Sequence, residues 1–141
     1  MTNDTEFTSI IDFGVDLSTV EAPKPLPAGV YDAVIQTAEL TKTKNSEDPK
    51  DMLKVTYSIS ADQYPADYVD GNPNGTTLTQ YFVADKSVRS MFALKRFLLA
   101  IGAPISNQLD ATTLIGLPAK IEVANQLWEG METARVARVV A

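Results

Sequence analysis

The chain has 141 residues and a formal net charge of −6, and it contains no cysteine and no histidine. Their absence excludes disulfides, thiolate or imidazole metal ligands, and catalysis that depends on Cys or His. The length suits one domain with a single hydrophobic core. No apolar run approaches the roughly 20 residues of a membrane span, and residues 1–6 lack the features of a secretory signal. We therefore expect a cytosolic protein that does not bind a membrane.

The negative charge is concentrated at the N-terminus. Residues 1–22 contain five acidic residues and no basic one, which gives −5; the remainder contains 13 acidic and 12 basic residues, which gives −1. We therefore divide the chain into an acidic arm, residues 1–26, and one domain, residues 27–141. The arm either serves solubility alone or has a binding partner.

Within the arm, two behaviours are expected. Residues 1–12 are predicted to be mobile and to lie over a basic groove, where their carboxylates would stand in for phosphates. The apolar side chains around Phe13 and Leu17 are predicted to pack on the domain, so that residues 13–22 act as a strap. Prolines at positions 23, 25 and 27 predict an extended approach to the first strand.

Two strands joined by a polar loop are predicted after the arm. Residues 30–40 form an apolar run, and residues 52–61 form a second segment in which apolar and polar residues alternate. A period of two places the two sets on opposite faces of a strand, one packed and one in solvent. The packed set is Leu53, Val55, Tyr57 and Ile59. The connecting loop, residues 42–51, is long for a tight hairpin.

A third strand is predicted over residues 76–83. It follows an acidic segment, residues 62–75, that ends in Asn-Gly, a strong turn signal. Leu78 and Phe82 share one face of this strand, and Tyr81 lies on the other. Tyr81 is therefore either an exposed platform for stacking or part of a barrel filled from both faces.

The spacing of apolar residues then changes from two to three and four, which predicts an amphipathic helix over residues 87–101. Asp85 or Ser87 can cap its start, and Gly102 can end it. We expect Phe92 and Phe97 to lie in the core. The basic residues of this region are expected to form the solvent-facing side of the helix; they are Lys86, Arg89 and Arg96.

One short turn and two strands complete the predicted elements. The turn covers residues 111–115, and the strands cover residues 119–124 and 133–140, joined by residues 125–130. Three strands, a helix and two strands is the order of a five-stranded OB-fold barrel, in which the helix lies between strands three and four. An open α+β sheet uses the same elements and is the alternative.

Several segments resemble one bacteriophage family of small proteins long described as a domain of unknown function, which includes OB-fold single-stranded DNA-binding proteins. The segments are residues 16–21 (DLSTVE), 25–31 (PLPAGVY), 38–39 (AE), 43–45 (TKN), 52–54 (MLK) and 114–119 (LIGLPA). The resemblance covers about residues 14–124. It implies an OB barrel that coats single strands during phage replication or recombination in the cytoplasm of the infected bacterial host.

The sequence departs from that family in two places. Residues 61–75 are longer than the usual short turn, and the C-terminus lacks the acidic tail found in many single-strand-binding proteins. The resembling residues are mostly structural, so they identify few contacts with DNA.

Candidate contacts follow from what single-strand binding needs, which is cations for phosphates and exposed aromatics on which bases stack. In an OB barrel these belong to the face of strands two and three and to the loops between strands one and two and between four and five. Tyr64 and Tyr68 lie in the acidic segment and are not candidates. The candidates are Lys42, Lys44, Lys50, Lys54, Tyr81 and Trp128.

The sequence gives no support for an enzyme, because it lacks a phosphate-binding glycine loop, a nucleophile elbow and a metal-ligand spacing. We expect no cofactor. The expected function is non-sequence-specific binding of single-stranded DNA, with phage replication or recombination proteins as further partners and a homodimer left open. The alternative is an OB-type protein-interaction or virion module that does not bind nucleic acid. The nearly neutral domain favours this alternative, and the clustered lysines favour DNA.

Overall fold

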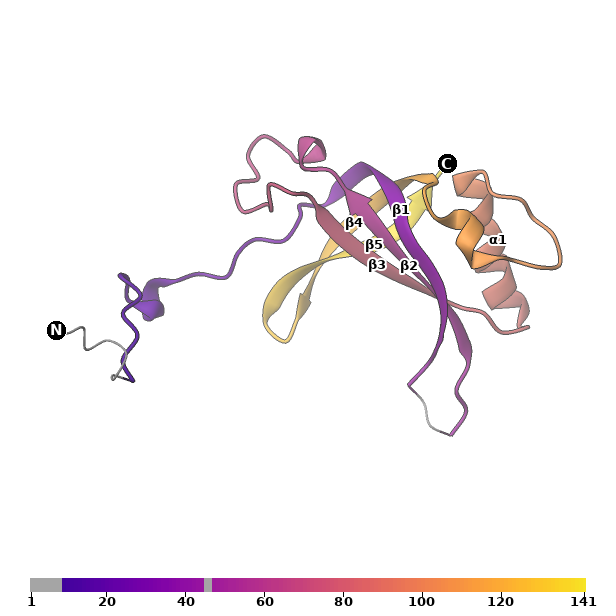
Figure 1. The fold of residues 1–141 in the computed structure, drawn as a ribbon, viewed down its shortest axis with the longest axis horizontal. Coiled ribbons are helices and arrows are strands. Elements are labelled where there is room, and N and C mark those ends of the chain that lie inside the picture. The colour runs from indigo at the N-terminus through magenta and orange to yellow at the C-terminus, as the bar shows by residue number, and fades with distance from the viewer. Residues whose placement is uncertain (1–8, 45–46) are drawn as a thin grey trace.

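The computed structural model describes residues 9–44 and 47–141. Five antiparallel strands form one sheet in the order β3-β2-β1-β4-β5, and a single α-helix connects β3 to β4. Figure 1 shows α1 at one end of the curved sheet and the N-terminal segment leaving from the other. The elements are β1 (Gly29–Lys42), β2 (Asp51–Ile59), β3 (Thr76–Val83), α1 (Val88–Ile101), β4 (Pro118–Trp128) and β5 (Met131–Val140). The predicted element order and mainly-β class are confirmed.

The two edge strands of the sheet are β3 and β5. Cα atoms of these strands come within 8 Å of each other, but within the described residues no hydrogen-bonded ladder joins them. The sheet is therefore strongly curved without being closed as a barrel.

Strand β1 is shared by the two halves of the sheet. Its first half pairs with β4, from Gly29 to Val34, and its second half pairs with β2, from Val34 to Lys42. The register shifts between Ile35 and Thr37, which is a β-bulge. A bulge bends a strand and increases its twist. This bend allows β1 to pair with β4 in one half of the sheet and with β2 in the other.

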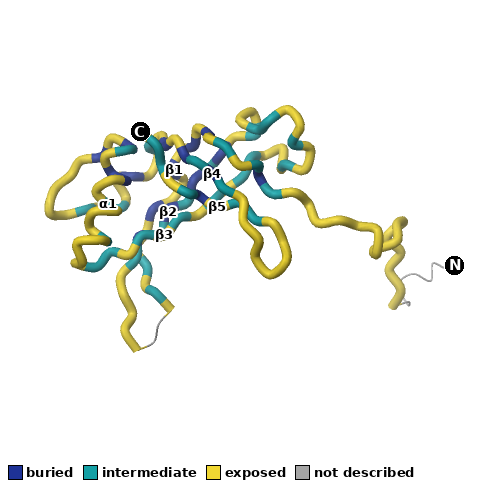
Figure 2. Tube along the Cα trace, turned by 180° about the vertical axis from the view of Figure 1, so that it is seen from behind, coloured by how far each residue is buried: buried dark blue, intermediate teal, exposed yellow. Residues whose placement is uncertain are grey.

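The core lies on the inner face of the curved sheet, and Figure 2 shows the buried residues gathered in its centre. The alternation predicted in the second strand is confirmed, because all four of its apolar side chains are fully buried. The short helix η4 (Ala111–Leu114) covers one end of the core, and the residues directly after it, Gly116 and Leu117, are joined to Ile35 of β1 by backbone hydrogen bonds. The largest fully buried side chains are Tyr57, Ile35, Leu53, Ile59, Leu114, Ile121, Val55 and Val123.

Helix α1 has the predicted ends. The Ser87 side chain accepts a hydrogen bond from the Ser90 backbone N–H, and Gly102 adopts the left-handed conformation that ends the helix. Phe97 is buried, as predicted, but the prediction that Phe92 is a core residue is wrong, since Phe92 is 57% exposed. At 100° per residue, Phe92 and Phe97 lie about 140° apart around the helix, and only the Phe97 side faces the sheet.

No helix in the described residues is long and apolar enough to cross a membrane.

The N-terminal arm does not form the predicted strap. Every residue from 9 to 24 is exposed, and Phe13 and Leu17 are both 58% exposed. The segment is organised locally: Asp16 caps a short helix, η2 (Leu17–Thr19), by accepting a hydrogen bond from the Ser18 backbone. The apolar side chains of this segment therefore do not pack on the domain. The prediction of a mobile segment over residues 1–12 falls mostly on residues 1–8, which lie outside the described residues.

The last hairpin is longer than predicted. Strand β4 continues through residues 125–128, which were predicted to belong to the connection, and β5 begins at residue 131 instead of 133. Only Glu129 and Gly130 form the turn. Both turn residues have positive φ, 51° and 80°, as two-residue hairpin turns of type I′ require. This part of the strands was not predicted from the sequence because the hairpin is exposed on both faces here. Polar residues such as Asn125 and Gln126 therefore occur without an alternation of apolar and polar positions.

Gly75 precedes β3, has a φ of +94°, and would place a Cβ atom 2.7 Å from the Ile59 carbonyl oxygen. We expect Gly75→Ala to lower the free energy of unfolding by about 1–3 kcal/mol because it combines backbone strain with a clash against another strand. Gly102→Ala is the matched control, since Gly102 has a φ of +73° and open space around it. Urea denaturation should show a larger loss for Gly75→Ala; equal losses would contradict the clash.

Candidate nucleic-acid interface

Strands β2 and β3 present an outer face that is separate from the core. The inner side chains of β2 are buried, so Lys54 and its alternate neighbours point outward. On β3, Tyr81 is 54% exposed and lies directly opposite Lys54 in the ladder. Glu39 of β1 is opposite Lys54 on the other side. A row of three side chains, Glu39, Lys54 and Tyr81, therefore crosses three strands.

This arrangement excludes the interpretation of Tyr81 as a side chain inside the barrel, while its role as a stacking platform stays a prediction. The Tyr81 ring lies on the outside of the sheet, and the inner positions of β3 are taken by Leu78, Gln80 and Phe82, which are partly buried. Beside it, the hydroxyls of Thr56 and Thr79 lie 3.3 Å apart. The outer face thus combines an exposed aromatic ring, a cation and hydroxyl groups, which are the groups that can contact a base, a phosphate and a sugar.

Three of the four candidate lysines are ion-paired. Lys42 Nζ lies 2.7 Å from Asp51 Oδ1, and Lys54 Nζ lies 3.8 Å from Glu39 Oε1. Lys50 Nζ lies 3.6 Å from Asp85 Oδ2. Lys44 belongs to none of the ion pairs between described residues.

The charge of this region is balanced. Residues 39–54 contain four acidic residues and four basic ones, a net charge of zero. The lysines could be identified in the sequence, but two of their partners could not. Glu39 lies beside Lys54 because of the register between β1 and β2, and Asp85 lies near Lys50 because the chain returns to the hairpin just before α1. The carboxylates of Asp51 and Glu39 are exposed, whereas that of Asp85 is only partly exposed. Exposed pairs contribute about 0–1 kcal/mol, so another anion can replace the carboxylate of Asp51 or Glu39 at small cost.

Asp85 connects the lysine-bearing hairpin to the start of α1. Its carboxylate accepts hydrogen bonds from the Ser87 hydroxyl at 2.7 Å and the Ser87 backbone N–H at 3.0 Å. These bonds, with smaller contributions from Ser90 and Lys50, lower the pKa of Asp85 to about 2. The carboxylate therefore stays ionised well into the acid range.

We expect Ser87→Ala to raise the pKa of Asp85 toward the ordinary value of 3.8. The substitution removes the Ser87 hydroxyl, whose hydrogen bond lowers this pKa most, and leaves the backbone N–H in place. A lowered folded-state pKa stabilises the fold above the unfolded-state value, and that contribution is lost as the pH falls toward 2. An NMR titration of the Asp85 carboxyl group measures the shift. An identical pKa in both proteins would show that Ser87 is not its cause.

Trp128 is the last residue of β4, opposite Met131, and is 64% exposed. Leu127 and Met131 beside it are also exposed. In Figure 1 the β4–β5 hairpin and the β1–β2 hairpin both project from the lower side of the molecule, apart from each other. The structure thus joins Lys54 with Tyr81 and gathers Lys42, Lys44 and Lys50 at one hairpin, but it leaves Trp128 on the other.

Tyr64 and Tyr68 have structural contacts, consistent with their exclusion as candidates. Their rings pack edge to face with centroids 5.2 Å apart. The Tyr64 hydroxyl donates to the Asn72 carbonyl, and the Tyr68 hydroxyl donates to the Lys24 carbonyl. Burial raises the pKa of Tyr68. These contacts hold the long segment before β3 and tie the base of the arm to it.

A small, mainly-β protein with an outward aromatic and polar strand face is the class that this fold and surface define. In the part of the chain that the structure describes, no group of three or more acidic side chains is arranged to hold a metal ion. A family model described as "Protein of unknown function (DUF669)" matches residues 13–132, and the chain belongs to that family. No curated protein matches the chain.

Proposed function

We propose that this protein is an OB-fold single-stranded DNA-binding protein that acts without sequence preference and without chemistry. The strand connectivity supports the OB-fold: β1 pairs with both β2 and β4, the helix follows β3, and β3 approaches β5. OB-folds are partly open barrels that bind oligonucleotides on the face of strands two and three. An open edge between β3 and β5 is compatible with that fold.

The observation that carries the proposal is the adjacent pair of Tyr81 and Lys54 on the outer face of β2 and β3. A base can stack on the Tyr81 ring while the Lys54 ammonium group contacts the neighbouring phosphate. Stacking is sequence-tolerant because every base has a π face. The resemblance noted in the sequence supports a role in phage replication or recombination, in the cytoplasm of the infected host, as part of this proposal.

Lys42, Lys44 and Lys50 extend the surface along the β1–β2 hairpin. Because Lys42 is paired with the exposed Asp51 and Lys50 with the partly exposed Asp85, DNA binding at these two lysines would exchange carboxylates for phosphates rather than fill an empty cationic groove. With about four phosphates neutralised, the slope of log affinity against log salt is near −3, at about 0.7 per phosphate on single strands.

Tyr81 variants test the proposal. We expect Tyr81→Ala to weaken oligo-dT binding by about 1–3 kcal/mol, whereas Tyr81→Phe keeps the stacking face and binds nearly as well. Fluorescence anisotropy of labelled oligo-dT measures both. Thr77→Ala, an exposed position on the same face of β3, controls for general effects of altering this strand. Equal affinities for Tyr81→Ala and wild type would exclude the outer face as the binding surface.

A second candidate is a protein-interaction module without nucleic-acid binding. The balanced charge of residues 39–54 and the exposed apolar residues of α1 and of the arm favour it. It predicts no oligo-dT binding even at low salt.

A further inference from the structure

The arm carries an apolar surface that has no place on its own domain. Ile11, Phe13, Val15, Leu17 and Val20 are all more than half exposed. Residues 9–22 also contain three acidic residues and no basic one. An exposed segment that is both acidic and apolar has the composition of a docking peptide for a basic, apolar groove.

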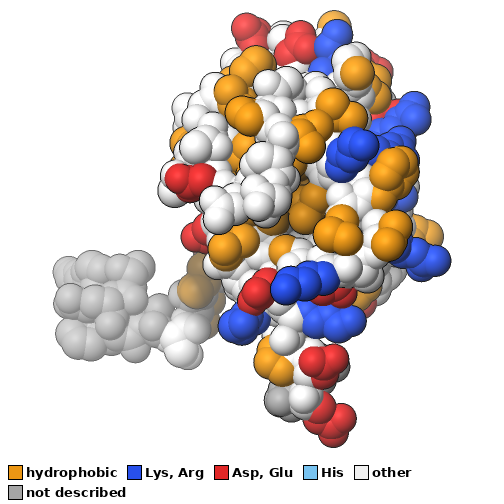
Figure 3. Space-filling model, turned by 90° about the vertical axis from the view of Figure 1, so that its right-hand side faces the viewer, with side chains coloured by type: hydrophobic (Ala, Val, Ile, Leu, Met, Phe, Trp, Pro, Cys, Tyr) orange, Lys and Arg blue, Asp and Glu red, His pale blue; other side chains and the backbone are white. Residues whose placement is uncertain are grey.

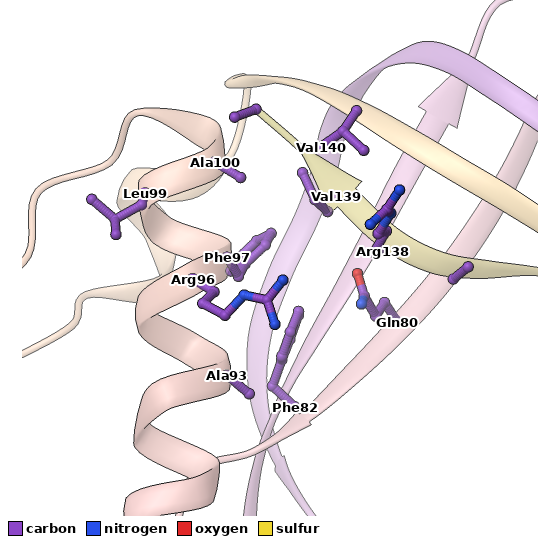
Figure 4. Close-up of a pocket in the computed structure, with 12 residues that line it drawn as sticks. Gln80, Phe82, Ala93, Arg96, Phe97, Leu99, Ala100, Arg138, Val139 and Val140 are labelled. Atoms are coloured by element: carbon purple, nitrogen blue, oxygen red, sulfur yellow. The ribbon is translucent and has the colours of Figure 1, made fainter.

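A groove of that kind lies between α1, β3 and β5. This α1–β3–β5 cleft has a volume of about 580 Å³, within the range of ligand pockets. Phe82, Phe97 and Val139 give it an apolar lining, and Figure 4 shows Arg96 extending from α1 across it toward the sheet. Arg138 lies on the opposite wall, beside Gln80.

The cleft carries positive charge. Among the described residues that line it, two are basic, Arg96 and Arg138, and none is an aspartate or glutamate. Arg138 is paired with Glu122 at 2.7 Å, but none of the ion pairs between described residues engages Arg96. Figure 3 shows Lys and Arg side chains beside exposed apolar ones on the α1 side of the molecule. Charge and apolar character thus complement the arm.

The base of the arm lies far from its own cleft. The Lys24 backbone N–H donates to Asp70, the Lys24 carbonyl accepts from Tyr68, and Leu26 is buried. These contacts direct the arm outward from the end of the sheet opposite α1, as Figure 1 shows. The cleft of a neighbouring molecule is therefore easier for the arm to reach than the cleft of its own molecule.

We propose that residues 9–22 of one copy dock in the α1–β3–β5 cleft of a second copy. The contact is heterologous, so repeated docking forms an open chain of molecules rather than a closed dimer. The outer face of β2 and β3 stays free in such a chain, because the cleft is lined from the inner side of β3. The inference goes beyond the proposed function and does not depend on it.

Sedimentation velocity of the full chain without DNA tests this proposal. We expect the wild-type sedimentation coefficient to rise with protein concentration and to fall on adding salt, which screens exposed charges. The arm variant is Phe13→Ser with Leu17→Ser, and the cleft variant is Arg96→Glu. Each alone is expected to lose about tenfold or more in self-association. Arg89→Glu, on the same helix but outside the cleft, is the matched control and should associate as the wild type does.

A mixture of the two variants gives the sharpest result. The cleft variant has an intact arm and the arm variant has an intact cleft, so an equimolar mixture should form 1:1 dimers and nothing larger. The altered side chains are exposed, so circular dichroism should show unchanged folding. Wild type that remains monomeric at every concentration would overturn the proposal, and protected arm amides in that monomer, measured by hydrogen exchange, would instead show docking within one chain. Association of both variants at the wild-type level would overturn it as well.

Discussion

Trp128→Ala is expected to weaken binding to oligo-dT by about 1–3 kcal/mol while leaving the fold intact. The indole is the only one in the chain and lies at the exposed end of β4. In an OB-fold, the hairpin of strands four and five borders the strand face that binds oligonucleotides. Stacking of a base on Trp128 should also quench its fluorescence, so one titration reports both affinity and location.

Two controls separate stacking from other roles of Trp128. Trp128→Phe keeps an aromatic face and should retain most of the affinity, and Leu127→Ala removes an exposed apolar neighbour that points to the other face of the hairpin. Fluorescence that changes with protein concentration in the absence of DNA would assign Trp128 to a contact between copies instead.

Leu114→Ala is expected to lower the free energy of unfolding by about 2–5 kcal/mol, as large-to-small substitutions at buried sites do. The Leu114 side chain is fully buried. It is the last residue of η4, and directly after η4 the Gly116 N–H donates to the Ile35 carbonyl and the Ile35 N–H donates to the Leu117 carbonyl. The cavity would therefore open at the β-bulge that bends β1.

Ile115→Ala is the matched control for that measurement, because Ile115 is the next residue and about half exposed. Surface substitutions of this kind change stability by about 0.5 kcal/mol or less. Urea denaturation followed by circular dichroism gives both values. Similar losses for the two variants would show that η4 does not close the core.

The buried strand and the capped helix were predictable because their signals are local. The alternation around Val55 and Tyr57 depends only on the period of a strand, and the ends of α1 depend on a hydroxyl at Ser87 and a left-handed glycine at Gly102. The expectation of an OB-fold barrel came from the likeness of the element order to a known architecture; of it, the structure shows the mainly-β class, the five antiparallel strands and the one helix. Closure of the sheet depends on pairing between distant strands, which no local pattern contains.

The errors concern residues whose surroundings are set by tertiary contacts. Phe92 matches the helical spacing of the core residues, but the sheet covers only one side of α1 and leaves Phe92 in solvent. Phe13 and Leu17 were assigned to a strap from their apolar character alone, and in the structure both remain 58% exposed instead of packing on their own domain.

In the candidate site too, local patterns could be predicted from the sequence and tertiary contacts could not. Lys54 and Tyr81 could be chosen from the sequence one at a time, since each lies on the polar face of its strand. Their adjacency follows from the β2–β3 register, and the pairing of Lys54 with Glu39 follows from the β1–β2 register. The sequence shows that residues 39–54 contain as many acidic as basic residues, and only the fold shows which carboxylate pairs with which lysine.

Competition among poly-dT, duplex DNA and RNA of equal length for one labelled oligo-dT probe tests the central claim most directly. The proposed function predicts that poly-dT displaces the probe far more effectively than duplex DNA, because Tyr81 and Trp128 can stack only on bases that are not already paired. Equal displacement by duplex DNA, or no binding of the probe at low salt, would contradict single-stranded DNA binding by this protein.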